Sequence, residues 1–116
     1  MMDEDAMKSA MNYVYEIHLW KLAPTLDKEV ERIDPLSIQV RSDWHGVGET
    51  GSLVEYCILL TTGGPAVRIV GELQRNEPAT ALLQCQNWYT PWETVKLKKS
   101  DTDLILEYAN SFYYGN

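Results

Sequence analysis

Four apolar stretches separated by short polar turns constrain the fold of this chain more than any other feature of its sequence. In the first stretch Leu36, Ile38 and Val40 alternate with polar residues, which is typical of a half-buried strand. The connections between successive stretches are short, so each strand should pair antiparallel with the next. The sequence therefore predicts an antiparallel meander sheet of about four strands, at residues 36–44, 53–61, 66–73 and 80–88.

Glycine and proline mark the turns of this sheet. Residues 45–52 contain three glycines and are predicted to form a loop. In the turn at residues 62–65, Gly63 and Gly64 can both adopt the positive φ that tight hairpin turns require. A further short strand at residues 93–99, with its lysines facing water, is consistent with the sequence.

Helices are expected on both sides of the strand region. Residues 3–22 favour an amphipathic helix over a strand at residues 13–22, and Pro24 should end that helix. Thr25 is predicted to cap a short second helix, and Ser100 to begin the last helix with a partial capping box. The apolar faces expected for the three helices comprise Met7, Ala10, Met11, Val14, Ile17 and His18; Leu26, Val30 and Ile33; and Leu104, Ile105, Tyr108, Ala109 and Phe112.

Taken together, these elements predict a single α+β domain over residues 1–116. An antiparallel sheet should lie under packed N-terminal and C-terminal helices. A length of 116 residues is enough to bury a core without disulfides or metals.

The charge balance and the start of the chain limit the classes of partner. The net charge of −7 argues against direct nucleic-acid binding, because phosphate contacts need clustered Lys and Arg. The acidic start is unlike a secretory signal, and no apolar run is long enough for a membrane span, so we expect a cytoplasmic protein without membrane contact. Cys57 and Cys85 are expected to be reduced core residues, with a disulfide between adjacent strands as the alternative.

The sequence contains no strong catalytic or metal-binding motif. Its two histidines, His18 and His45, have no further ligands at metal-binding spacing, so no metal and no cofactor is expected. The sequence therefore favours a binding protein over an enzyme, and no catalytic residue is assigned. An alternative hypothesis is a small-molecule-binding or enzymatic pocket formed by Asp43, Trp44, His45 and Trp88.

Aromatic residues are the most distinctive part of the composition. The chain has four Trp and seven Tyr but one Phe, and Tyr and Trp suit half-exposed positions and interfaces. Pro91 cannot donate to a sheet ladder, so the strand that ends near Trp88 should stop there. We predict that Trp88 is mostly buried on the helix-covered face of the sheet, and that Trp92 is partly exposed beside the last helix. Tyr89, Trp92 and Glu93 are the candidate protein-binding residues.

Four segments of the sequence resemble a known group of proteins. These are "DPLSIQVRSDWH", "TGGPAVRIVGEL", "QNWYTPWE" and "LILEYANSFYYG", which span roughly residues 34–115. Together they are similar to a group of small uncharacterised bacterial proteins found on plasmids, integrative elements and prophages. The resemblance transfers no residue role, but it implies a setting on mobile DNA, where accessory genes often encode small binding proteins, including inhibitors of host defence.

The sequence thus supports three functional hypotheses. The first is a non-enzymatic acidic binding protein that occupies a surface on a protein of the host or of the mobile element. Its most specific version is an inhibitor of a host defence system, of the anti-CRISPR or antirestriction type. The second is the pocket described above. The third is a homodimer or other homo-oligomer, in which half-exposed aromatic side chains bury against a second copy of the chain.

Overall fold

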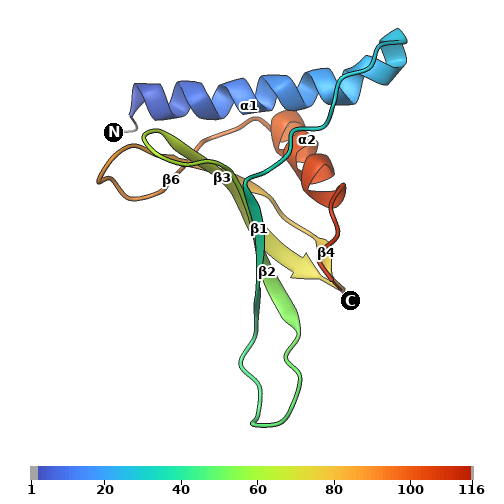
Figure 1. Ribbon diagram of the computed structural model, residues 1–116, viewed down its shortest axis with the longest axis vertical. Helices are drawn as coiled ribbons and strands as arrows, with labels where there is room; N and C mark the ends of the chain where they lie inside the picture. The colour runs from blue at the N-terminus through green and yellow to red at the C-terminus, as the bar shows by residue number, and fades with distance from the viewer. Residues whose placement is uncertain (1–2, 116) are drawn as a thin grey trace.

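The computed structural model describes residues 3–115 and has an α+β fold with an antiparallel sheet, as the sequence predicts (Figure 1). The hairpin of the first two strands projects away from the helices (Figure 1). The elements are α1 (Glu4–Leu22), the 3₁₀ turn η1 (Ala23–Leu26), β1 (Ser37–Ser42), β2 (Leu53–Thr61), β3 (Ala66–Gln74), β4 (Glu77–Pro78), β5 (Leu82–Gln86), β6 (Glu93–Thr94) and α2 (Lys99–Asn110).

All strand pairs of the sheet are antiparallel, in the order β1-β2-β3-β5-β6, with β4 paired separately to β3. The strands expected from alternation are present as β1, β2, β3 and β5. The strand count is higher than predicted because β4 is two residues long, which is too short to produce a periodic pattern, and because β6 forms at the start of the further strand expected at residues 93–99, of which it covers only Glu93–Thr94. In the turn between β2 and β3, Gly63 has a positive φ of 92°, whereas Gly64 does not and precedes a cis peptide bond to Pro65.

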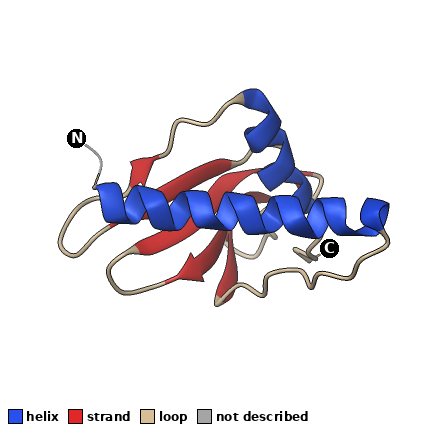
Figure 2. Cartoon of the chain, turned by 90° about the horizontal axis from the view of Figure 1, so that it is seen from above, coloured by secondary structure: helices blue, strands red, loops and turns tan. Residues whose placement is uncertain are grey.

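The core lies between one face of the sheet and the two helices. Along β2, Tyr56, Ile58 and Leu60 are buried, while the residues between them point to the opposite face. α1 crosses the buried face, and α2 packs on the same side (Figure 2). Ile17 of α1 and Ile105 of α2 are both fully buried in this cluster.

The helices differ from the prediction in several details. Met7, Met11 and His18 were expected on the buried face of α1 but are exposed, because Ala6, Ala10, Val14 and Ile17 occupy that face. The short second helix is absent: η1 ends where Asp27 adopts a left-handed conformation, and residues 28–36 are not helical. α2 begins at Lys99 without a side-chain cap, so the partial capping box at Ser100 does not form.

Three buried tyrosines join the layers through their hydroxyl groups as well as their rings. Tyr56 donates to the carbonyl of Thr80 at 2.6 Å, and Tyr108 donates to that of Ile33 at 2.7 Å. Tyr114 donates to a carbonyl of α2 at 2.6 Å. Burial raises the pKa of all three phenols above the usual value, so they stay protonated donors at neutral pH.

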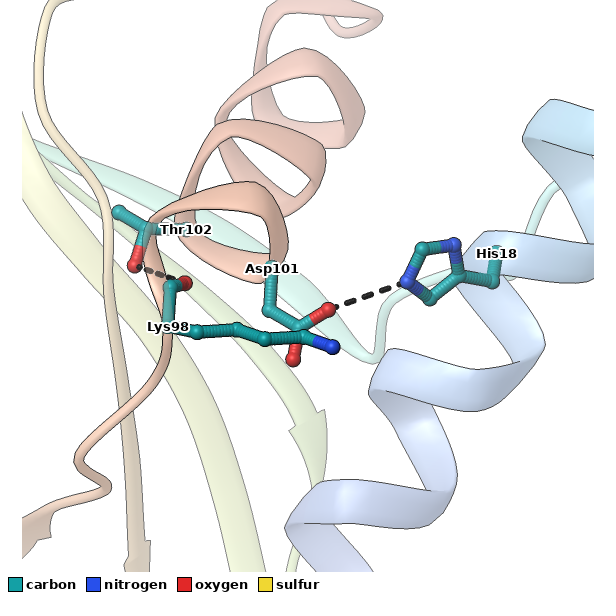
Figure 3. A network of polar contacts seen from close by, with 4 residues as sticks. All are labelled: His18, Lys98, Asp101 and Thr102. Carbon is teal, nitrogen blue, oxygen red and sulfur yellow. Dashed lines mark hydrogen bonds and ion pairs between the residues drawn. The ribbon is translucent and has the colours of Figure 1, made fainter.

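A histidine on α1 contacts a buried carboxylate on α2. His18 Nε2 lies 3.1 Å from Asp101 Oδ1, and Asp101 is the one charged residue that is buried among residues 3–115 (Figure 3). Asp101 lies in the first turn of α2, where the positive end of the helix dipole favours a negative charge. The contact therefore fixes the start of α2 against the C-terminal part of α1.

Replacing His18 by alanine should lower the free energy of unfolding by about 1 kcal/mol, because the buried Asp101 carboxylate loses a side-chain partner. Urea unfolding of the single variants His18→Ala and Asp101→Asn and of the double variant measures the coupling between the two residues. A coupling of zero would show that the contact contributes nothing to stability.

Candidate functional site

The turn after β5, residues 87–91, places two aromatic side chains in solvent, and we call it the aromatic corner. Tyr89 is fully exposed and has a positive φ of 60°, and Trp88 is 64% exposed. The prediction that Trp88 is mostly buried is wrong. β5 ends at Gln86, so the chain has left the sheet before it reaches Trp88. The indole lies over Gly64, where a Cβ atom would overlap its nitrogen.

Hydrogen bonds between side chains and backbone hold the aromatic corner in one conformation. The Asn87 N–H donates to Thr90 Oγ1 at 3.0 Å, and the Thr90 hydroxyl donates to the Asn87 carbonyl at 2.9 Å. The Trp88 N–H donates to Asn87 Oδ1 at 2.9 Å, and Gln86 Nε2 donates to the Thr90 carbonyl at 2.8 Å. The two exposed rings are thus presented by an ordered turn.

A carboxylate-lined depression of about 370 Å³ lies between the aromatic corner and the start of α1. Asp3, Glu4 and Glu93 line it, and its lining within residues 3–115 includes no Lys or Arg. The Asp3 carboxylate accepts the Ala6 N–H at 3.0 Å, and this bond, followed by one from the Asn87 side chain, holds the pKa of Asp3 below its usual value. Asp3 therefore stays ionised while it links the first turn of α1 to the corner.

The structure does not gather Tyr89, Trp92 and Glu93 on one surface. Trp92 is partly exposed as predicted, but it does not lie beside the last helix: its ring stacks on the Arg68 guanidinium at 4.1 Å, on the sheet face that the helices do not cover. Glu93 pairs with the buried Cys85 and lines the depression on the helix side. The two residues are adjacent in a strand-like segment, so their side chains point to opposite faces.

The residues of the alternative pocket are also separated. Asp43, Trp44 and His45 lie in the loop between β1 and β2, at the far end of the projecting hairpin (Figure 1). Trp44 is fully exposed, and Asp43 Oδ1 accepts the Ser52 N–H at 2.8 Å, which orders the loop. Trp88 lies instead beside Gly64, at the other end of β2. Asp43, Trp44 and His45 line one cavity of about 580 Å³, and Trp88 is not part of it.

Several residues that shape the site were not singled out from the sequence. Asp3 and Glu4 were assigned to the helix start, and nothing in their spacing indicates that they face the aromatic corner. Gly64 was interpreted as a hairpin glycine. The Trp88 indole also lies so close to Gly64 that a larger residue at this position would overlap it. Arg68 had no signal beyond its place in an alternating strand.

The two cysteines do not pair with each other. Cys85 lies in the core, on the helix-covered face of β5, as predicted, whereas Cys57 is half-buried on the open face of β2, and β3 runs between these strands. Burial raises the pKa of both thiols, which reduces their reactivity at neutral pH.

Within residues 3–115, no three His, Cys, Asp or Glu side chains are grouped so that they could hold a metal ion. In the same range, neither helix has the length and apolar character needed to cross a membrane. Comparison of the chain with protein-family models, with curated protein sequences and with solved structures found no match in any of the three.

Proposed function

We propose that the chain is a non-enzymatic protein-binding domain whose aromatic corner occupies a basic surface of a partner protein. The observation that carries this proposal is the exposure of Trp88 and Tyr89 on a turn ordered by four side-chain hydrogen bonds. Trp and Tyr are enriched among the residues that dominate binding energy at protein interfaces. Because the turn is already ordered, less conformational entropy is lost when a partner binds.

The charge around the corner supports a basic partner. Asp3, Glu4 and Glu93 line the adjacent depression, and the whole chain has a net charge of −7. Complementary charge steers association and rejects acidic partners. A surface that presents Lys or Arg beside an apolar recess would fit both the carboxylates and the aromatic rings.

The resemblance to proteins of mobile DNA supports a host or element protein as the partner. In the sharpest form of the proposal, the chain is an inhibitor of a host defence system of the anti-CRISPR or antirestriction type. Proteins that bind nucleic acid carry basic surfaces. An acidic domain bound to such a surface would compete with the nucleic acid, without contacting nucleic acid itself.

Capture from a bacterial host lysate tests the proposal with matched variants. We expect the double variant Trp88→Ala/Tyr89→Ala to bind the captured protein at least about 30-fold more weakly, since the loss of one interface hot spot already costs about 2 kcal/mol. The control variant Tyr15→Ala/Tyr113→Ala removes two other exposed aromatic rings and should bind as the wild type does. Urea midpoints of both variants should stay close to that of the wild type, because all four rings are largely in solvent.

The contribution of the carboxylates to partner binding is tested with the double variant Glu4→Gln/Glu93→Gln, which leaves the helix cap Asp3 intact. This variant should bind more weakly at low salt and show a smaller salt dependence. If the corner variant recovers the same proteins with the same affinity as the wild type, the aromatic corner is not the binding surface.

A further inference from the structure

The sheet face that the helices leave uncovered carries a depression of about 600 Å³, which we call the open-face depression. Side chains alternate between the two faces of a strand, so Arg68 and Val70, the neighbours of the buried Ile69 in β3, point to this face. In the adjacent strands, Cys57 of β2 is opposite Val70, and Gln84 of β5 is opposite Arg68. All four of these open-face residues line the depression.

The Arg68 side chain is held in place at this face by two neighbours. Its Nε donates to Gln84 Oε1 at 2.8 Å, and its guanidinium stacks on the Trp92 ring at 4.1 Å from the ring centroid. Gln84 is itself fixed, because its Nε2 donates to Thr94 Oγ1 at 3.2 Å. These contacts use Nε and one face of the guanidinium. Within residues 3–115, the two terminal nitrogens of Arg68 have no hydrogen-bond acceptor.

No carboxylate balances the charge of Arg68 in the described part of the chain. Arg68 takes part in none of the ion pairs formed by residues 3–115. Arg41 and Glu55 also line the depression, but they pair with each other. Two arginines against one glutamate leave this lining with an excess of one positive charge, in a chain whose net charge is −7. The open-face depression therefore attracts an anion that the chain as a whole repels.

We propose that the open-face depression binds a small organic anion, whose carboxylate or phosphate group accepts two hydrogen bonds from the terminal nitrogens of Arg68. The planar guanidinium presents its N–H groups in a fork that matches either oxyanion. Gln84 and Trp92 already hold this side chain, so less conformational entropy is lost on binding. The volume lies within the range of about 300–1,000 Å³ that is typical of small-molecule sites. Cys57 and Val70 provide an apolar floor for the rest of the ligand.

Cys57 makes binding at this site measurable. Its thiol is half-buried in the depression, whereas Cys85 is buried in the core, so N-ethylmaleimide should modify Cys57 first. The reaction is followed by mass spectrometry at about pH 8, where part of a thiol is ionised. Benzoate is the probe, because it joins a carboxylate to a small apolar ring. For a Kd of about 1 mM, we expect 10 mM benzoate to slow the modification of Cys57 about tenfold.

Two further ligands separate the oxyanion from other causes of protection. Benzyl alcohol has the same ring without a carboxylate and should leave the rate of Cys57 modification unchanged. Inorganic phosphate distinguishes the two oxyanions, since protection by phosphate as well as benzoate would show that the site accepts both. Sodium chloride keeps the ionic strength equal in all samples, so that charge screening does not differ between them.

Variants of Arg68 test the proposed contact directly. Arg68→Gln should abolish the protection of Cys57 by benzoate. The control Lys8→Gln removes the same charge from an exposed position of α1 and should be protected as the wild type is. Arg68→Lys keeps the charge but loses the fork, so it should bind benzoate about tenfold more weakly, which decides the matter if the glutamine variant does not fold. A wild type that neither benzoate nor phosphate protects, or a folded Arg68 variant that is protected as the wild type is, would overturn the proposal.

This inference does not rest on the proposed function. The double variant Trp88→Ala/Tyr89→Ala, which tests the aromatic corner, leaves Arg68 and its contact with Trp92 in place. Benzoate should therefore protect Cys57 in this variant as it does in the wild type. Loss of partner binding and loss of benzoate protection are thus separate results, each produced by its own substitution.

Discussion

Replacing Tyr108 by alanine should lower the free energy of unfolding by about 3–5 kcal/mol, as for other buried aromatic residues. Tyr108 has no exposed surface, and its ring makes edge-on contacts with Trp20 at 6.1 Å and with Phe112 at 5.1 Å between centroids. The cavity would lie where α1, α2 and the segment before β1 meet. Since domains of this size are stable by about 5–15 kcal/mol, the loss threatens the fold. Urea unfolding followed by circular dichroism measures it.

The variant Tyr108→Phe separates the hydroxyl from the ring. It keeps the packing but removes the hydrogen bond to the Ile33 carbonyl, so we expect a loss of about 1 kcal/mol. If the alanine variant were no less stable than the phenylalanine variant, the ring would not be part of the core as we describe it.

Replacing Gly71 by alanine should have the second largest effect, about 3 kcal/mol or more, because an added methyl group would force the backbone apart. A Cβ atom at Gly71 would overlap the carbonyl oxygen of Thr80. That carbonyl also accepts the Tyr56 hydroxyl at 2.6 Å, and Thr80 Oγ1 accepts the Glu72 N–H at 2.9 Å. The segment before β5 therefore lies directly on β3, and it cannot move away without breaking these bonds.

Gly48→Ala is the matched control for this prediction. Gly48 has a positive φ of 83°, but nothing lies within 4 Å of an added Cβ atom. Its replacement should cost about 1–2 kcal/mol, from backbone strain alone. Equal urea midpoints for the two variants would mean that the backbone around Thr80 shifts away from an added methyl group at little cost. The close approach at Gly71 would then not restrict the side chain at this position.

The strands and the long helices could be predicted from the sequence because their patterns record which face is buried. The sequence of β1 alternates, that of β2 is almost continuously apolar and that of β3 alternates less strictly, and short connections leave antiparallel pairing as the simple solution. The stripe of Leu104, Ile105, Tyr108 and Ala109 correctly identified the buried face of α2. In α2 apolar residues dominate one face and polar residues the other, so local sequence and tertiary packing agree.

The errors occur where size or chain direction, rather than hydrophobicity, decides burial. Met7 and Met11 are more hydrophobic than Ala6 and Ala10, but the alanines allow the closer approach of α1 and occupy the core instead. Trp88 is strongly apolar, yet the chain turns away from the sheet before this residue. Its indole is therefore largely exposed and packs only against Gly64. Hydrophobic pattern alone does not contain this information.

For the candidate site, the amino-acid pattern alone predicts that an aromatic segment interrupted by Pro91 ends a strand, and that the chain is acidic. Which side chains this segment exposes, and which neighbours they meet, depends on the packing of the whole domain. Trp92 stacks on Arg68 of β3, and Glu93 turns to the opposite face beside Asp3 of the α1 start. These contacts join residues far apart in the chain, and their geometry depends on the order of the strands and the docking of α1, which no local pattern encodes.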